Sequence, residues 1–144
     1  MPGTLIFITG ATGFIGSQVV AATLRAGYNV RLSIRKPEQD QLLRERHAEF
    51  LDQIETVVIP DITDANSIKG HLIGVNYVFH IASPMPGTGS DLITDYINPA
   101  VKGTESILSA TIDFAAIRKV VIVASILSLL PLTTFTSKEV EVKG

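Results

Sequence analysis

Three glycines near the N-terminus have the spacing of a loop that binds phosphate groups. Gly10, Gly13 and Gly16 fall within the stretch Thr9-Gly10-Ala11-Thr12-Gly13-Phe14-Ile15-Gly16. In such a loop the first glycine allows a sharp turn, the second lets a pyrophosphate approach the backbone, and the third lets a helix pack closely. The N–H groups and the dipole at the start of that helix would face the phosphates. The alternative is a glycine-rich turn without a ligand. The predicted dinucleotide contacts are Gly10, Thr12, Gly13, Phe14, Ile15 and Gly16.

The residues around this loop predict the strand and the helix that the site needs. Leu5–Thr9 is a continuous apolar run, as in a strand buried on both faces. Ser17–Ala26 is amphipathic and is followed by Gly27, which can end a helix. Further strands are expected at Asn29–Ile34, Glu55–Ile59, Tyr77–Ile81 and Lys119–Ala124, and further helices at Gln39–Phe50, after an N-cap at Asp64, and at about Ser90–Ala116 with a bend near Pro99.

This alternation predicts an α/β fold with a doubly wound parallel sheet of the Rossmann type. About five strands are expected, in three layers α/β/α. Ligand in such a sheet binds at the carboxyl ends of the strands, where the strand order reverses. We expect residues 1–132 to form this domain, and residues 133–144 to be a tail or the start of a further segment.

The glycine spacing and its neighbours, T-G-A-T-G-F-I-G, resemble the extended short-chain dehydrogenase/reductase family. Within this family the chain is most similar to the dihydroflavonol reductases, the cinnamoyl-CoA reductases and their fungal relatives, in the NAD-dependent epimerase/dehydratase superfamily. The resemblance runs from Thr4 to about Pro131. It implies the NADP(H)-binding domain of a carbonyl reductase, with a small carbonyl compound as substrate.

The end of the second expected strand predicts which dinucleotide binds. A site for NAD usually has an acidic residue about 20 residues after the glycine motif, which binds the ribose hydroxyls. This chain has Ile34-Arg35-Lys36 there. A guanidinium can bind two oxygens of a 2′-phosphate and stack on adenine. The resemblance makes Arg35 the phosphate clamp, because relatives read V-R-x-x-V-R at this place, with Lys36 in support. The alternative is a solvated basic pair.

The resemblance assigns further cofactor contacts to the ends of the third and fourth strands. Asp61 and Ile62 would hold the adenine, through the carboxylate and through the next backbone N–H. The alternative is an aspartate that bonds to its own turn. Ala82 and Ser83 would line the ribose and the nicotinamide.

The three histidines have no spacing that suits a metal ion, so no metal site is predicted. His80 lies inside an apolar strand, and we expect a buried neutral imidazole bonded to backbone. His47 and His71 lie in polar stretches and are expected to face solvent.

Ser125 corresponds, by this resemblance, to the serine that hydrogen-bonds the substrate carbonyl. The family's chemistry also needs a Tyr-x-x-x-Lys pair beyond that serine. The tyrosines of this chain are residues 28, 77 and 96, and none has a lysine four residues later. We therefore expect either a fragment of a reductase or a truncated product that does something other than standard hydride transfer, and little or no reductase activity of this chain alone. Two alternatives stay open: a nucleotide-binding module or pseudoenzyme that acts through a partner, and a non-redox isomerase or cyclase that reuses the fold.

Composition limits the classes of partner. The 144 residues carry a net charge of −2 with a pI near 5.9, which argues against nucleic acid and anionic membranes. No cysteine is present, so disulfides and thiolate metal sites are excluded. The sequence shows neither a secretory signal nor a spanning segment, and a cytoplasmic location is expected. Because hydrophobic residues make up 46% of the chain, we expect exposed apolar surface that meets a second copy or a partner chain.

Overall fold

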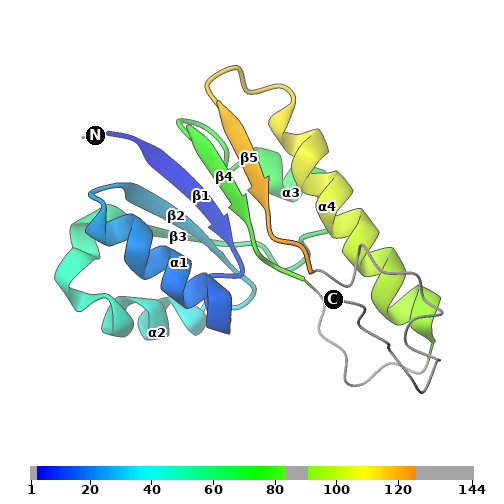
Figure 1. The fold of residues 1–144 in the computed structure, drawn as a ribbon, viewed down its shortest axis with the longest axis horizontal. Coiled ribbons are helices and arrows are strands. Elements are labelled where there is room, and N and C mark those ends of the chain that lie inside the picture. The colour runs from blue at the N-terminus through cyan, green and yellow to red at the C-terminus, as the bar shows by residue number, and fades with distance from the viewer. Residues whose placement is uncertain (1–2, 84–90, 126–144) are drawn as a thin grey trace, which may run out of the picture.

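The computed structural model describes residues 3–83 and 91–125, which form one parallel sheet covered by helices (Figure 1). Its strand order is β3-β2-β1-β4-β5, so the order reverses between the neighbours β1 and β4. This confirms the predicted doubly wound sheet of the Rossmann type. The strands are β1 (Leu5–Thr9), β2 (Asn29–Ile34), β3 (Ile54–Val58), β4 (Tyr77–His80) and β5 (Lys119–Ile122).

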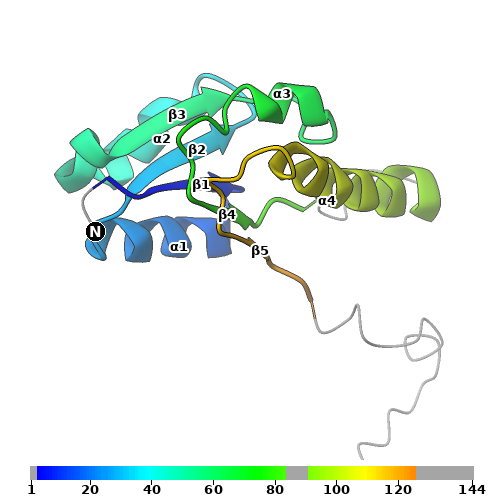
Figure 2. The same cartoon turned by 90° about the horizontal axis from the view of Figure 1, so that it is seen from above.

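Helices cover both faces of the sheet and complete three layers (Figure 2). Residues of α1 (Phe14–Arg25) and α2 (Gln39–Arg46) pack in one core, and residues around α3 (Ala65–Lys69) and of α4 (Asn98–Thr111) pack in the other. Each core lies on its own side of the strands, which confirms the predicted α/β/α arrangement. Two short segments complete the described helices: the 3-10 helix η1 (Ala48–Gln53) and the π-helix η2 (Ile93–Ile97).

The central strand β1 shows why the sheet needs cover on both faces. Ile6 and Ile8 contribute to the core under α1, while Phe7 between them contributes to the core under α4. All three are buried, and burial of each such side chain stabilises the fold by about 1.5–3 kcal/mol. The continuous apolar run therefore reflects a strand buried on both sides, as predicted.

The helix boundaries differ from the predicted ones where a turn sets the start or the end. The first helix begins at Phe14 rather than Ser17, because the extended Gly13 is its N-cap. Gly27 has φ +80° and ends this helix as expected. The polar helix after Pro37 stops at Arg46 and continues as η1, not to Phe50 as one helix. At Asn98, next to Pro99, the π-helix η2 gives way to α4, and the bend predicted there stays a prediction.

Part of the sequence-based interpretation concerns residues beyond this description. Residues 133–144, expected to be a tail or the start of a further segment, lie outside the described residues, as do residues 126–132 of the predicted domain. Within residues 3–83 and 91–125, no helix is long and apolar enough to cross a membrane.

Candidate functional site

The glycine loop joins β1 to α1 at the carboxyl edge of the sheet. Gly10 has φ +75°, a left-handed conformation that favours glycine. A Cβ on Gly10 would lie 2.7 Å from the backbone nitrogen of Ala82, in the loop after β4. A Cβ on Gly16 would lie 1.9 Å from the carbonyl oxygen of Gly10. Close backbone packing therefore demands glycine at both positions.

Gly13 is different, because its backbone is extended and the space beside it is open. A Cβ there would meet only the carbonyl oxygen of Gly10, at 3.3 Å. Gly13 caps α1 without a side-chain hydrogen bond, so the N–H groups of the first turn suit an anionic ligand. Phe14 and Ile15 follow on this open edge, with Phe14 90% exposed. Thr12, in the same loop, is half-buried.

The Thr9 hydroxyl ties the end of β1 to the loop after β4. Its Oγ1 accepts hydrogen bonds from the backbone nitrogens of Ile81 at 3.1 Å and Ala82 at 3.2 Å. The same atom lies 2.9 Å from Nδ1 of His80. With both acceptor positions in use, the hydroxyl donates to Nδ1, and the imidazole proton sits on Nε2. Sequence reasoning did not single out Thr9 as a linking residue.

His80 is buried and neutral, as expected, but its partner is not the expected one. Burial lowers the pKa of the imidazole. The expected bond to backbone is not made at Nδ1, where the Thr9 hydroxyl from the neighbouring strand is the partner. His80 is thus part of the connection between β1 and β4 at the reversal of strand order.

Ala82 and Ser83 continue from β4 along the same edge as Gly10. Ala82 is half-buried and Ser83 is exposed. Strand β5 runs beside β4 with His80 paired to Ile122, and Val123 donates its N–H to the His80 carbonyl at 3.0 Å. Ser83 and Ser125 each follow that pair by three residues, and Ser125 is exposed. The structure therefore places both serines at the carboxyl edge of adjacent strands.

Arg35 and Lys36 follow the last residue of β2 and have exposed side chains. Among the described residues, no carboxylate forms an ion pair with either cation. Arg31, the other arginine of the V-R-x-x-V-R pattern, has a structural role instead. It pairs with Glu55 at 2.9 Å and donates to the backbone carbonyls of His71 and Ile73. Arg31 therefore makes contacts within the fold, whereas Arg35 has an exposed side chain at the end of β2.

Gln39 lies beside the basic pair and was missed by the sequence analysis. Its side-chain oxygen accepts the backbone N–H groups of Arg35 at 2.8 Å and Lys36 at 3.0 Å. Its side-chain nitrogen lies 3.4 Å from the hydroxyl of Thr12 in the glycine loop. The available signal was a polar residue at the start of a helix that opens after Pro37, which does not by itself specify partners.

Asp61 and Ile62 follow β3 and are held from two sides. The carboxylate of Asp61 accepts the N–H of Thr63 at 2.8 Å and its hydroxyl at 2.7 Å. These two bonds, with a smaller effect of Lys102, lower the pKa of Asp61. The Ser106 hydroxyl, from α4, donates to the carbonyl of Ile62. The turn that was the alternative for Asp61 is present, and contact with adenine stays a prediction.

The remaining histidines do not form a site. His47 is buried, so the expectation that it faces solvent is wrong; burial and then the charges of Arg46 and Arg25 lower its pKa. His71 is half-buried in the loop after α3. No group of three or more histidine or acidic side chains in the described part of the chain could hold a metal ion.

The carboxyl edge of the sheet collects the predicted site residues from separate parts of the chain. In Figure 1 the arrowheads of β1, β4 and β5 point to the same side, from which α1 begins. Parallel strands necessarily bring their carboxyl ends to one edge. The segments that follow these ends are Gly10–Gly16, Arg35 and Lys36, Asp61 and Ile62, Ala82 and Ser83, and Ser125.

Comparison with known proteins gives concordant matches. The model of the NAD dependent epimerase/dehydratase family matches residues 6–128. Ketoreductase sphI of Aspergillus fumigatus is 39% identical over 132 residues, which are 92% of this chain. Cinnamoyl-CoA reductase 1 of Oryza sativa subsp. japonica is 35% identical over 121 residues, covering 84% of this chain. The crystal structure of yeast methylglyoxal/isovaleraldehyde reductase Gre2 complexed with NADPH superposes with a TM-score of 0.78 and 29% identity over 85% of this chain.

The matches cover only part of each relative. The chain spans 38% of ketoreductase sphI, 34% of cinnamoyl-CoA reductase 1 and 37% of Gre2. The family match nevertheless takes in β1 from Ile6 onward, the glycine loop, every other described strand and the residues up to Ser125. This chain belongs to the NAD dependent epimerase/dehydratase family.

Proposed function

We propose that this chain is the NADP(H)-binding portion of an NADPH-dependent carbonyl reductase. One observation carries the proposal: an open glycine loop lies at the reversal of strand order, and the cations Arg35 and Lys36 follow β2 where a site for NAD has a carboxylate. The relatives support the same proposal, since one is a ketoreductase, another is a cinnamoyl-CoA reductase, and Gre2 was solved with NADPH.

Each group at the carboxyl edge would contact a different part of the nucleotide. The open space beside Gly13 suits the pyrophosphate, and the first-turn N–H groups of α1 would donate to it. The exposed guanidinium of Arg35 would bind the 2′-phosphate, with Lys36 adding positive charge. Asp61 and Ile62 would contact the adenine, and Ala82 and Ser83 the ribose and nicotinamide.

Bound NADPH would supply the hydride that reduces a carbonyl carbon. Ser125 would donate a hydrogen bond to the carbonyl oxygen and hold it at the edge beside Ser83. A serine hydroxyl is too weak an acid to give up its proton at neutral pH, so the proton must come from another group. Family resemblance assigns that task to a tyrosine, and no tyrosine follows Ser125 in these 144 residues.

The proposal is tested by isothermal titration of the protein with NADPH and with NADH. We expect tighter binding of NADPH. In the Arg35→Ala variant a charged hydrogen bond of roughly 1.5–3 kcal/mol is lost, so NADPH affinity should fall roughly ten- to hundredfold while NADH affinity changes much less.

The control is Arg46→Ala, which removes an exposed arginine from the last turn of α2, away from the edge. It should leave both affinities near those of the parent protein. Equal binding of NADPH and NADH by the parent would overturn the proposal and identify Arg35 and Lys36 as a solvated basic pair.

A further inference from the structure

Gln39 connects two loops that are far apart in the sequence. Its Oε1 accepts the backbone N–H groups of Arg35 and Lys36, and its Nε2 reaches the hydroxyl of Thr12, 27 residues earlier. The orientation of the amide follows from its partners, because two N–H donors must face an oxygen. One side chain thus holds the loop after β2 against the glycine loop.

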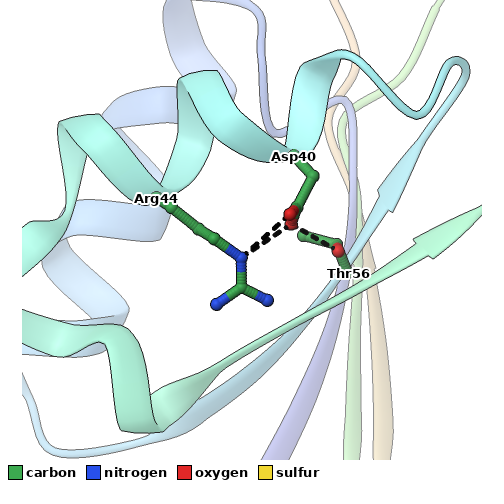
Figure 3. A network of polar contacts seen from close by, with 3 residues as sticks. All are labelled: Asp40, Arg44 and Thr56. Atoms are coloured by element: carbon green, nitrogen blue, oxygen red, sulfur yellow. Dashed lines mark hydrogen bonds and ion pairs between the residues drawn. The ribbon is translucent and has the colours of Figure 1, made fainter.

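The helix that carries Gln39 is itself anchored to the sheet (Figure 3). The carboxylate of the next residue, Asp40, accepts the Thr56 hydroxyl of β3 at 2.6 Å and the Nε of Arg44 at 2.9 and 3.0 Å. The bond to Thr56 is the largest of the effects that lower the pKa of Asp40, so the carboxylate stays ionised and keeps both partners. The first turn of α2 therefore presents Gln39 from a fixed position.

The amide is the side chain whose chemistry suits this place. The N–H groups of Arg35 and Lys36 need an acceptor, and the Thr12 hydroxyl can accept from the amide nitrogen. A carboxylate could accept the same two N–H groups, but it would place a negative charge where a 2′-phosphate is expected. A neutral amide accepts, donates and leaves the positive field of the two cations intact.

We propose that Gln39 is a positioning residue that determines the preference for a 2′-phosphorylated nucleotide. It fixes the backbone that carries Arg35 and Lys36 at a set distance from the glycine loop, so that one nucleotide can contact both the basic pair and the glycine loop. This inference rests on the proposed function, and it adds a residue that does not itself contact the reacting atoms.

The test compares Gln39→Ala and Gln39→Glu by titration with NADPH and NADH, with circular dichroism to verify folding. The alanine variant frees the loop, so NADPH affinity should fall about tenfold and NADH affinity less than threefold. The glutamate variant keeps the two acceptor bonds and adds charge. It should therefore retain NADH binding near the parent level and weaken NADPH by more than the alanine variant does.

A second readout reports on the loop without nucleotide. Hydrogen exchange at the backbone amides of Arg35 and Lys36 should be faster in Gln39→Ala than in the parent, and close to the parent rate in Gln39→Glu. The matched control is Gln41→Ala on the same helix, where the side chain donates to the carboxylate of the exposed Glu45 at 2.8 Å. It should change neither the affinities nor the amide exchange.

The outcomes separate this inference from the proposed function. If the parent prefers NADPH and both Gln39 variants keep the same ratio of affinities, the positioning role is overturned and the proposed function stands. If both variants weaken the two nucleotides equally, Gln39 only supports the fold. If the parent shows no preference, the proposed function itself fails, whatever Gln39 does.

Discussion

Among single residues, the three loop glycines face different physical demands. Gly10 needs a left-handed backbone next to Ala82, and Gly16 needs room for the carbonyl of Gly10. Gly13 has an ordinary extended backbone and open space beside it. Two of the glycines are therefore required by the fold itself, and the third by the ligand that we propose.

This difference makes a prediction for two substitutions. Gly13→Val should fold and yet lose nucleotide binding, because its methyl groups would occupy the space of the pyrophosphate. Gly16→Ala should destabilise the protein by about 1–3 kcal/mol, because its methyl group overlaps the Gly10 carbonyl. Circular dichroism, urea unfolding and nucleotide titration measure these effects. A folded Gly13→Val variant with normal binding would show that the loop is a turn without a ligand.

Between elements, the connection of β1 to β4 depends on one hydroxyl and one imidazole. Thr9 is fully buried and serves three groups of the neighbouring segment, which are the His80 ring and the N–H groups of Ile81 and Ala82. Thr9 and His80 are buried, so water cannot easily replace the bond between them, while Ile81 and Ala82 are half-buried. The geometry of the loop that carries Ala82 and Ser83 therefore depends on this pair of strands.

The neutral imidazole of His80 predicts how stability varies with pH. Its pKa in the folded protein lies below the ordinary value of 6.5, so the unfolded chain binds more protons between these two values. The free energy of unfolding should be highest above pH 7 and fall as the pH drops through 6.5 toward the folded pKa. Urea unfolding at pH 7.5, 6.5 and 5.5 measures this trend.

The control for this trend is His80→Asn, whose side-chain oxygen can still accept the Thr9 hydroxyl. It should reduce the loss of stability between pH 7.5 and 5.5. A residual loss is expected, because the pKa of buried His47 is also lowered. An unchanged pH dependence in His80→Asn would mean that the pKa of His80 is the same in the folded and the unfolded protein, which would contradict the prediction.

Over the whole molecule, apolar side chains gather on the outer face of α4 and on the neighbouring strand β5. Ile97, Val101, Leu108 and Ile112 recur at helical spacing and are exposed, with Ile112 at 80%. Val121 and Ile122 of β5 and the following residue, Val123, are also exposed. Among the described strands β5 pairs with β4 alone, and it forms an edge of the sheet. Surface of this kind favours association with another chain.

We therefore expect a dimer or larger species of the 144-residue protein in size-exclusion chromatography. We also expect the same protein to oxidise little or no NADPH in the presence of carbonyl compounds. No tyrosine follows Ser125 in these 144 residues, and a reaction without the family's general acid would be slower by roughly 10²–10⁴-fold. Ile112→Glu should shift the elution toward the monomer and leave NADPH binding unchanged, because Ile112 lies at the far end of α4. Rapid, Ser125-dependent oxidation by a monomer would require a proton donor that we have not identified.

The sequence by itself determined the succession of strands and helices along the chain and the parallel, doubly wound class of the sheet. Runs of buried residues and glycine turns are local signals, which is why β1 and β2 were predicted to the residue while β3, β4 and β5 were shifted or shortened at their ends. The positions of Arg35 and Ser125 at the carboxyl edge follow in turn, because parallel strands must share that edge. The family's motif added the roles that these residues are proposed to have.

Only the tertiary structure decided which side chains meet across that edge. The bond between Thr9 and His80 joins residues 71 apart, and the contact between Gln39 and Thr12 joins residues 27 apart. Such pairs depend on the register of β1 against β4 and on where α2 begins, and no local pattern encodes either. The burial of His47 was missed for the same reason. Its local stretch is polar, and the packing of η1 and α2 on the sheet removes its side chain from water.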